Sequence, residues 1–164
     1  MHNAENVVFL GPPGVGKTHL AIGLGITAAK NRHLTYCISC QDLISELNKA
    51  HFENQLQKKL KHYAKYKLLI IDEIEYLPMD IQGANLFFQL IAKRYEKCST
   101  IFTSNKPFSQ WGEVFSDNTF AATILDRILH HPTVVNIKGE SYRLKDRKEY
   151  MSSRKEITNT LLNK

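Results

Sequence analysis

The stretch Gly11-Pro12-Pro13-Gly14-Val15-Gly16-Lys17-Thr18 fits G-x-x-x-x-G-K-[ST], the pattern of a loop that binds the phosphates of a nucleotide. The apolar run Val7-Val8-Phe9-Leu10 precedes it and predicts a buried strand. From His19 onward the spacing predicts a helix, and the residues expected on its inward face are Leu20, Ala21, Leu24 and Ala28. A strand, a glycine-rich loop and a helix are the context that this motif requires. We therefore expect the chain to bind a nucleoside triphosphate.

Each fixed position of the loop has a chemical role. The glycines let the backbone approach a ligand closely, so that N–H groups at the start of the helix point toward the phosphates. Lys17 is expected along the β- and γ-phosphates, and the Thr18 hydroxyl is expected to bind Mg²⁺. The alternative is a strand–helix turn that binds nothing, but all four fixed positions and both flanks fit the motif.

The composition places limits on the class of protein. The 164 residues suffice for one domain with a core, and 43% hydrophobic with 23% charged residues is ordinary for a soluble globular protein. No run approaches the roughly 20 apolar residues of a membrane span, so we expect a cytoplasmic protein without membrane association. Cys37 and Cys40 form a C-x-x-C pair, but a metal or redox site would need further ligands. A net charge of +6 suits a polyanionic partner.

A second motif follows some 55 residues after the loop. Leu68-Leu69-Ile70-Ile71-Asp72-Glu73 reads as a buried parallel strand that ends in two acids, as the Walker B strand of a phosphate-loop protein does. We expect Asp72 to hold Mg²⁺ through water and Glu73 to orient and deprotonate the attacking water. Acids also end strands as simple turn residues, which is the alternative here.

Two further regions contribute candidate residues. Thr100-Ile101-Phe102-Thr103 predicts a buried strand, and Asn105 beyond its tip is expected near the γ-phosphate or, alternatively, as a turn residue before Lys106-Pro107. Helices are predicted from about Ile81 to Tyr95 and from Ser116 or Asp117 to about His131. The second of these carries Arg127 near its C-terminal end.

A lysine cluster lies directly before the predicted strand that begins at Leu68. Residues 57–67 hold five lysines and no acid, with interleaved tyrosines. Such a helix could contact a nucleic-acid backbone, or its lysines could simply form a solvated face, and the sequence leaves both open. The candidate DNA contacts are Lys49, Lys58, Lys59 and Lys61.

Several separate motifs together resemble one family. They are the phosphate loop continued as Lys17-Thr18-His19-Leu20-Ala21, the strand Leu68–Glu73, Thr103-Ser104-Asn105-Lys106, Trp111-Gly112-Glu113-Val114-Phe115, Ile124-Leu125-Asp126-Arg127-Ile128-Leu129-His130-His131 and Gly139-Glu140-Ser141-Tyr142-Arg143. In this order they resemble the IstB-like ATPases that assist bacterial transposases, within the AAA+ superfamily. The helicase loader DnaC and the replication initiator DnaA are similar at a greater distance.

The resemblance implies an α/β fold: a three-layer α/β/α P-loop NTPase with a parallel five-stranded sheet of order 5-1-4-3-2 and no separate lid domain. It implies ATP and Mg²⁺ as cofactors and assembly as a multimer on DNA. Asn105 is similar to the residue that senses the γ-phosphate, and Arg127 to an arginine finger that reaches a neighbouring subunit's site. Arg143 is similar to a second sensor arginine. The residues expected to bind ATP are thus Gly11, Pro12, Pro13, Gly14, Val15, Gly16, Lys17, Thr18, His19 and Arg143.

These features favour an ATPase that assembles on DNA through non-specific backbone contacts and assists a transposase. A helicase loader of the DnaC type is an alternative. A monomeric small-molecule kinase is another, although Glu73 is placed to activate water and an arginine-rich lid sequence is missing. A third is a nucleotide-binding module without hydrolysis. We expect residues 1–148 to form the ATPase core, residues 149–164 to form a basic, partly disordered tail, and a further segment to precede the first strand.

Overall fold

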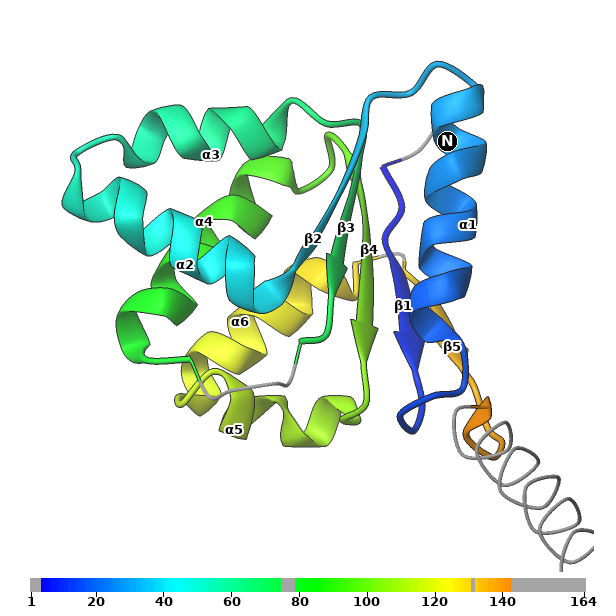
Figure 1. Cartoon of the computed structure of the whole chain (residues 1–164). Helices are drawn as coiled ribbons and strands as arrows, with labels where there is room; N and C mark the ends of the chain where they lie inside the picture. The colour runs from blue at the N-terminus through cyan, green and yellow to red at the C-terminus, as the bar shows by residue number, and fades with distance from the viewer. Residues whose placement is uncertain (1–3, 75–78, 131, 143–164) are drawn as a thin grey trace, which may run out of the picture.

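A five-stranded parallel sheet is the centre of the computed structural model, which describes residues 4–74, 79–130 and 132–142 (Figure 1). The strand order is β2-β3-β4-β1-β5, and every neighbouring pair is parallel. The strands are β1 (Val7–Leu10), β2 (Thr35–Ser39), β3 (Leu68–Asp72), β4 (Ser99–Ser104) and β5 (Thr133–Asn136). Read from the other edge, this is the order 5-1-4-3-2, so the expected fold is confirmed.

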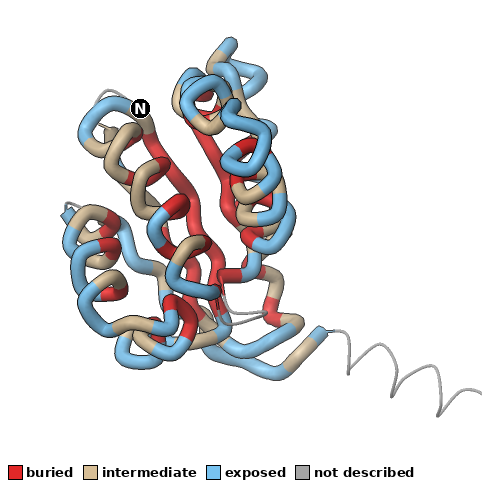
Figure 2. Tube along the Cα trace, turned by 90° about the vertical axis from the view of Figure 1, so that its left-hand side faces the viewer, coloured by how far each residue is buried: buried red, intermediate tan, exposed pale blue. Residues whose placement is uncertain are grey.

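Helices cover both faces of this sheet. They are α1 (Lys17–Lys30), α2 (Cys40–Phe52), α3 (Leu56–Ala64), α4 (Ile81–Arg94), α5 (Trp111–Val114) and α6 (Asn118–Ile128), with a short 3-10 helix η1 (Phe108–Gln110). Among the described helices, α1 alone lies on one face, while α2, α4 and α6 pack side by side on the other (Figure 1). Among the described strands, the three inner ones, β1, β3 and β4, are mostly buried between the two layers, whereas the edge strands β2 and β5 are more exposed (Figure 2).

The expected inward face of α1 is partly wrong. Ala21 and Ala28 are buried as expected, but Leu20 is 49% exposed and Leu24 is 43% exposed. The contact with the sheet is made by small residues, because a Cβ added to Gly25 would lie 2.7 Å from the Cδ1 of Ile70. This close approach leaves only a narrow stripe of α1 against the strands, and the leucines fall outside that stripe.

Local signals set several helix boundaries correctly. Ser39 caps α2, since its hydroxyl accepts a 3.0 Å hydrogen bond from the N–H of Asp42. The carboxylates of Asp80 and Asp117 cap α4 and α6 in the same way. Each cap accepts from backbone N–H groups that have no partner within the first turn of a helix.

Arg94, at the end of α4, is a buried cation that joins three elements. Its guanidinium donates to the carbonyls of Tyr63 and Tyr66 at 2.8 Å each and to that of Ser99 at 2.6 Å. It is 2% exposed, and burial lowers its pKa to about 10. The side chain therefore satisfies carbonyl oxygens at the end of α3 and the start of β4 that have no access to water.

Replacing Arg94 by methionine is expected to lower the free energy of unfolding by about 2–4 kcal/mol, because three carbonyl groups lose their donor. Urea unfolding followed by circular dichroism measures the change. Lys93→Met on the same helix is the control and should alter stability by less than about 0.5 kcal/mol. Equal stabilities of the two variants would contradict this role of Arg94.

None of the helices in the described part of the chain is long and apolar enough to cross a membrane. The described residues also contain no group of three or more His, Cys, Asp or Glu side chains suited to a metal ion. No disulfide bond joins Cys37, Cys40 or Cys98. Partial burial, and then the nearby charge of Asp72, raise the pKa of the Cys37 thiol, which makes it a poor nucleophile.

Candidate functional site

A cavity of about 430 Å³ lies over the phosphate loop. Parallel strands that end at the same edge bring distant residues together there, as in other open α/β sheets. The side chains and backbone that line it are those of Pro13, Gly14, Gly16, Lys17, Thr18, His19, Glu73, Thr103, Asn105 and Tyr142. Eight of these ten belong to the set predicted from sequence, and the volume lies in the range of small-ligand sites.

The loop has the backbone shape that only glycine adopts freely. Gly14 has φ +78°, and a Cβ there would lie 2.1 Å from the Oγ of Ser141. Gly16 has φ +96° and is the N-cap of α1, with open space beside it. Gly16 has no side chain that could cap this end of α1. The first turn of α1 borders the cavity, and the N-terminus of a helix suits an anion.

Lys17 lies at the centre of the site. It is 7% exposed, and its Nζ donates to the carbonyls of Gly11 and Pro12 at 2.7 and 2.9 Å. The same nitrogen donates to the Oδ1 of Asn105 at 2.5 Å. The loop and the tip of β4, which are 88 residues apart, are therefore joined by one ammonium group.

Thr18 and Asp72 form an oxygen pair beside this lysine. The Thr18 hydroxyl lies 3.0 and 3.1 Å from the two carboxylate oxygens of Asp72. Magnesium in phosphate-transfer sites is held by one or two such oxygen ligands together with substrate phosphates. The pair fits a Mg²⁺ ion of this kind, although Asp72 itself borders a neighbouring cavity next to β2.

Glu73 follows β3 in an unusual backbone conformation. Its φ is +59°, a left-handed value that costs a non-glycine residue about 1–3 kcal/mol unless its surroundings hold it. Its side chain is exposed and lines the cavity with Lys17 and Asn105. Strained residues of this kind cluster at functional sites, and here the turn directs a carboxylate toward the ligand space.

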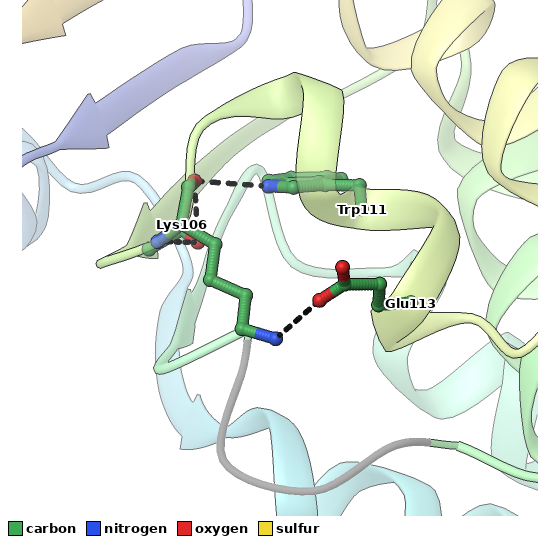
Figure 3. Close-up of polar contacts among 4 residues, drawn as sticks. Lys106, Trp111 and Glu113 are labelled. Carbon is green, nitrogen blue, oxygen red and sulfur yellow. Dashed lines mark hydrogen bonds and ion pairs between the residues drawn. The ribbon is translucent and has the colours of Figure 1, made fainter.

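Asn105 is fixed by a tight turn after β4. The Ser104 hydroxyl accepts from the N–H of Lys106 and donates to its carbonyl, both at 3.1 Å. The indole N–H of Trp111, a fully buried residue, donates to the same carbonyl at 3.2 Å (Figure 3). Lys106 also pairs with Glu113 at 3.3 Å, as Figure 3 shows. The segment Trp111–Phe115 is thus the packed connection that supports the Asn105 turn.

Arg127 lies elsewhere in the chain. Its guanidinium carbon is 4.4 Å from the centre of the Phe88 ring, over which it stacks. It borders a second cavity, of about 440 Å³, with Tyr95, Glu96 and His130, and none of these residues lines the phosphate-loop cavity. Within one chain Arg127 therefore does not join the other candidate catalytic residues. Arg143 and the predicted tail 149–164 lie outside the described residues, as does His131.

Carboxylates from other parts of the fold lie beside the lysine cluster and offset part of its positive charge. The Lys59 ammonium lies 2.7 Å from the Glu46 carboxylate of α2, and hydrogen bonds from Lys59 and Tyr63 lower the pKa of Glu46. Lys49 and Lys58 line a cavity of about 490 Å³ that also includes Glu46 and Glu53. Lys61 is exposed outside it.

The tyrosines of this cluster are not available to a ligand. Tyr63 is fully buried and Tyr66 is 8% exposed, because both rings pack with Tyr36 beneath α3. The exposed aromatic ring of the region is instead Phe52, which is 77% exposed at the end of α2. The exposure of the Phe52 side chain could not be predicted from helical spacing, because it depends on where α2 ends.

Two residues lining the main cavity were missed by sequence reasoning. From the sequence, Thr103 is placed in a buried strand and in the motif Thr103–Lys106 but is given no role, although its place two residues before Asn105 was a usable signal. Tyr142 reaches the loop because its N–H donates to the Gly14 carbonyl at 3.0 Å. No local pattern predicts that contact, which joins segments 128 positions apart.

Comparison with known proteins identifies relatives over nearly the whole chain. A family model described as IstB-like ATP binding protein matches residues 1–150. A protein of insertion sequence IS232 from Bacillus thuringiensis subsp. berliner, named for ATP binding, is 62% identical over 146 residues, or 89% of this chain and 58% of that protein. A similarly named protein of insertion sequence IS21 from Pseudomonas aeruginosa is 52% identical over 91% of this chain and 56% of that protein. The chain thus spans less than two thirds of the length of these relatives.

Solved structures share the architecture. The DnaC helicase loader has a TM-score of 0.68 and 25% identity, covering 82% of this chain and 79% of that one. AMPPCP-bound DnaA from Aquifex aeolicus also has a TM-score of 0.68, with 19% identity over 90% of this chain and 44% of that one. The likeness to DnaA shows the fold alone, which is the AAA+ type of P-loop fold.

Proposed function

Because this chain belongs to the IstB-like ATP-binding family, we propose that it hydrolyses ATP to ADP and phosphate. The observation that carries the proposal is the meeting of Lys17, Glu73 and Asn105 around one cavity over the phosphate loop. These are a cation for the phosphates, a carboxylate for the attacking water and an amide that can contact the γ-phosphate.

The roles follow from chemistry and position. Lys17 exchanges its carbonyl and Asn105 acceptors for phosphate oxygens, which are charged and form stronger hydrogen bonds. Thr18 and Asp72 hold Mg²⁺, which when bound neutralises developing charge on the phosphates. Glu73 accepts the proton of the attacking water. Arg127 lies away from its own site and is assigned to the site of a neighbouring subunit.

We further propose that ATP drives assembly on duplex DNA and that the assembly assists a transposase. The support is that the relatives with 62% and 52% identity belong to insertion sequences. A helicase loader is the second candidate, favoured by the DnaC structure, but that likeness rests on 25% identity. On the DNA side, a net charge of +6 and the exposed lysines of α2 and α3 fit a phosphate backbone.

The decisive experiment for the function measures phosphate release from ATP with and without duplex DNA over a range of protein concentrations. Turnover per chain should rise with concentration, because a neighbouring subunit completes each site, and DNA should shift the rise to lower concentration. Phosphate passed to a small-molecule hydroxyl instead of water would favour a kinase. Absence of turnover under all conditions would leave only nucleotide binding and would contradict the proposal.

Neutralising two lysines tests the DNA contact. Lys58→Gln combined with Lys61→Gln is expected to reduce the slope of log affinity against log salt by about 2, since each lost phosphate contact removes about 0.9. Affinity should fall equally for unrelated sequences, as measured by fluorescence anisotropy. Lys59→Gln is the matched control, because Glu46 already pairs with that ammonium, and it should change the slope less. An unchanged slope in the double variant would mean that DNA binds to another surface of the protein.

A further inference from the structure

We propose that Thr103 is a positioning residue of the ATPase site, whose single hydroxyl sets the geometry of both Asp72 and Glu73. The inference rests on the ATP hydrolysis proposed above and adds a residue outside the phosphate loop, the two acids and Asn105. Thr103 lies on β4 beside the end of β3 and lines the phosphate-loop cavity. It is 1% exposed, so its hydroxyl exchanges little with water.

The hydroxyl of Thr103 makes two hydrogen bonds of opposite sense. It donates to the Oδ1 of Asp72 and accepts from the backbone N–H of Glu73 at 2.9 Å. A threonine hydroxyl has one hydrogen to donate and lone pairs to accept. An ionised carboxylate can only accept and an amide N–H can only donate, so the two directions are fixed. One side chain on the neighbouring strand thus contacts both consecutive acids, Asp72 through its carboxylate and Glu73 through its backbone N–H.

The backbone of Thr103 reinforces the same turn. Its carbonyl accepts from the N–H of Ile74 at 3.0 Å, directly after the two acids. Consecutive N–H groups of Glu73 and Ile74 are therefore both bound to one residue of β4. This explains how Glu73 is held at φ +59°, a conformation that its own side chain does not favour.

The consequence for the site is orientation of two carboxylates. The Thr103 bond holds Oδ1 of Asp72, while the Thr18 hydroxyl lies within 3.1 Å of both carboxylate oxygens. Oδ2 makes no bond to Thr103 and is the oxygen left for the metal position. The left-handed turn directs the Glu73 side chain into the cavity and away from the core. Without the hydroxyl, both groups gain alternative orientations, and a displacement near 1 Å can cost about 10²-fold in rate.

The test compares Thr103→Val, which keeps the shape but removes the hydroxyl, with Thr103→Ser, which keeps the hydroxyl. We expect Thr103→Val to lower kcat about 10–100-fold, with the KM for ATP changed less than about threefold. Thr103→Ser should restore kcat to within about threefold of the wild type. Thermal unfolding is measured for all variants, and Thr103→Ala serves as the second variant without a hydroxyl where valine unfolds the chain.

A readout independent of turnover uses Mn²⁺ in place of Mg²⁺. Its electron paramagnetic resonance signal, recorded with ATP bound, should show weaker Mn²⁺ binding in Thr103→Val and normal binding in Thr103→Ser. Wild-type kcat and Mn²⁺ binding in Thr103→Val would overturn the inference. Equal losses in Thr103→Val and Thr103→Ser would also overturn it, because the hydroxyl would then not be responsible. Failure of the wild type to hydrolyse ATP would instead overturn the proposed function.

Discussion

Replacing Arg127 by alanine is expected to lower ATP turnover by about 10³–10⁵-fold in the presence of DNA, while ATP binding to a single chain stays unchanged. Arg127 borders a different cavity from the phosphate loop and stacks on Phe88, which is why we propose that it acts on the nucleotide of a neighbouring subunit. Turnover is measured as phosphate release, and ATP binding by calorimetry on the diluted protein.

Two control variants test whether the loss of turnover is specific to the guanidinium of Arg127. Arg127→Lys keeps the charge but loses the planar fork that contacts two phosphate oxygens, and it should remain well below the wild type. Lys97→Ala removes an exposed cation at the end of α4 and should turn over ATP normally. A normal rate for Arg127→Ala would contradict the assignment, and so would a loss of ATP binding by the single chain.

Replacing Glu73 by glutamine is expected to lower turnover by about 10²–10⁴-fold, the usual contribution of a general base. The amide keeps the size of the side chain and can still line the cavity, so ATP affinity should change less than about threefold. Calorimetric titration with ATP and Mg²⁺ measures the affinity, and phosphate release measures the rate.

The matched control for Glu73 is Glu113→Gln. Glu113 is 70% exposed and pairs with Lys106 on the surface, an interaction worth little to stability. ATP turnover by the Glu113→Gln variant should equal that of the wild type. Unchanged turnover in Glu73→Gln would remove the proposed base, and the site would then have to activate water by another group.

Much of the fold could be predicted because its signals are local. The phosphate loop requires glycine at fixed positions, and the strand before Asp72 is a continuous apolar run, so both are visible in short windows. Parallel strands then bring their tips to one edge of the sheet, which places Lys17 near Asn105 without further information.

What escaped prediction depends on contacts between distant segments. Leu20 and Leu24 were placed inward by helical spacing, but Gly25 brings α1 so close to the sheet that only small residues fit there. The bonds of Thr103 to the Asp72 carboxylate and to the N–H of Glu73 join positions 31 and 30 residues apart in the sequence. Likewise, the charge of Lys59 is balanced by Glu46 from another helix, which a count of lysines along one helix does not include.

We propose that each active site is composite: one chain supplies Lys17, Asp72 and Glu73, and its neighbour supplies Arg127. The most direct measurement mixes Glu73→Gln chains with Arg127→Ala chains, each inactive alone, and follows phosphate release on DNA. In the mixture, an interface can join an intact Glu73 on one chain to an intact Arg127 on the other. We expect turnover to return, up to about a quarter of the wild-type rate when equal amounts of the two variants pair at random. No recovery at any mixing ratio, although the two variants co-assemble, would contradict it.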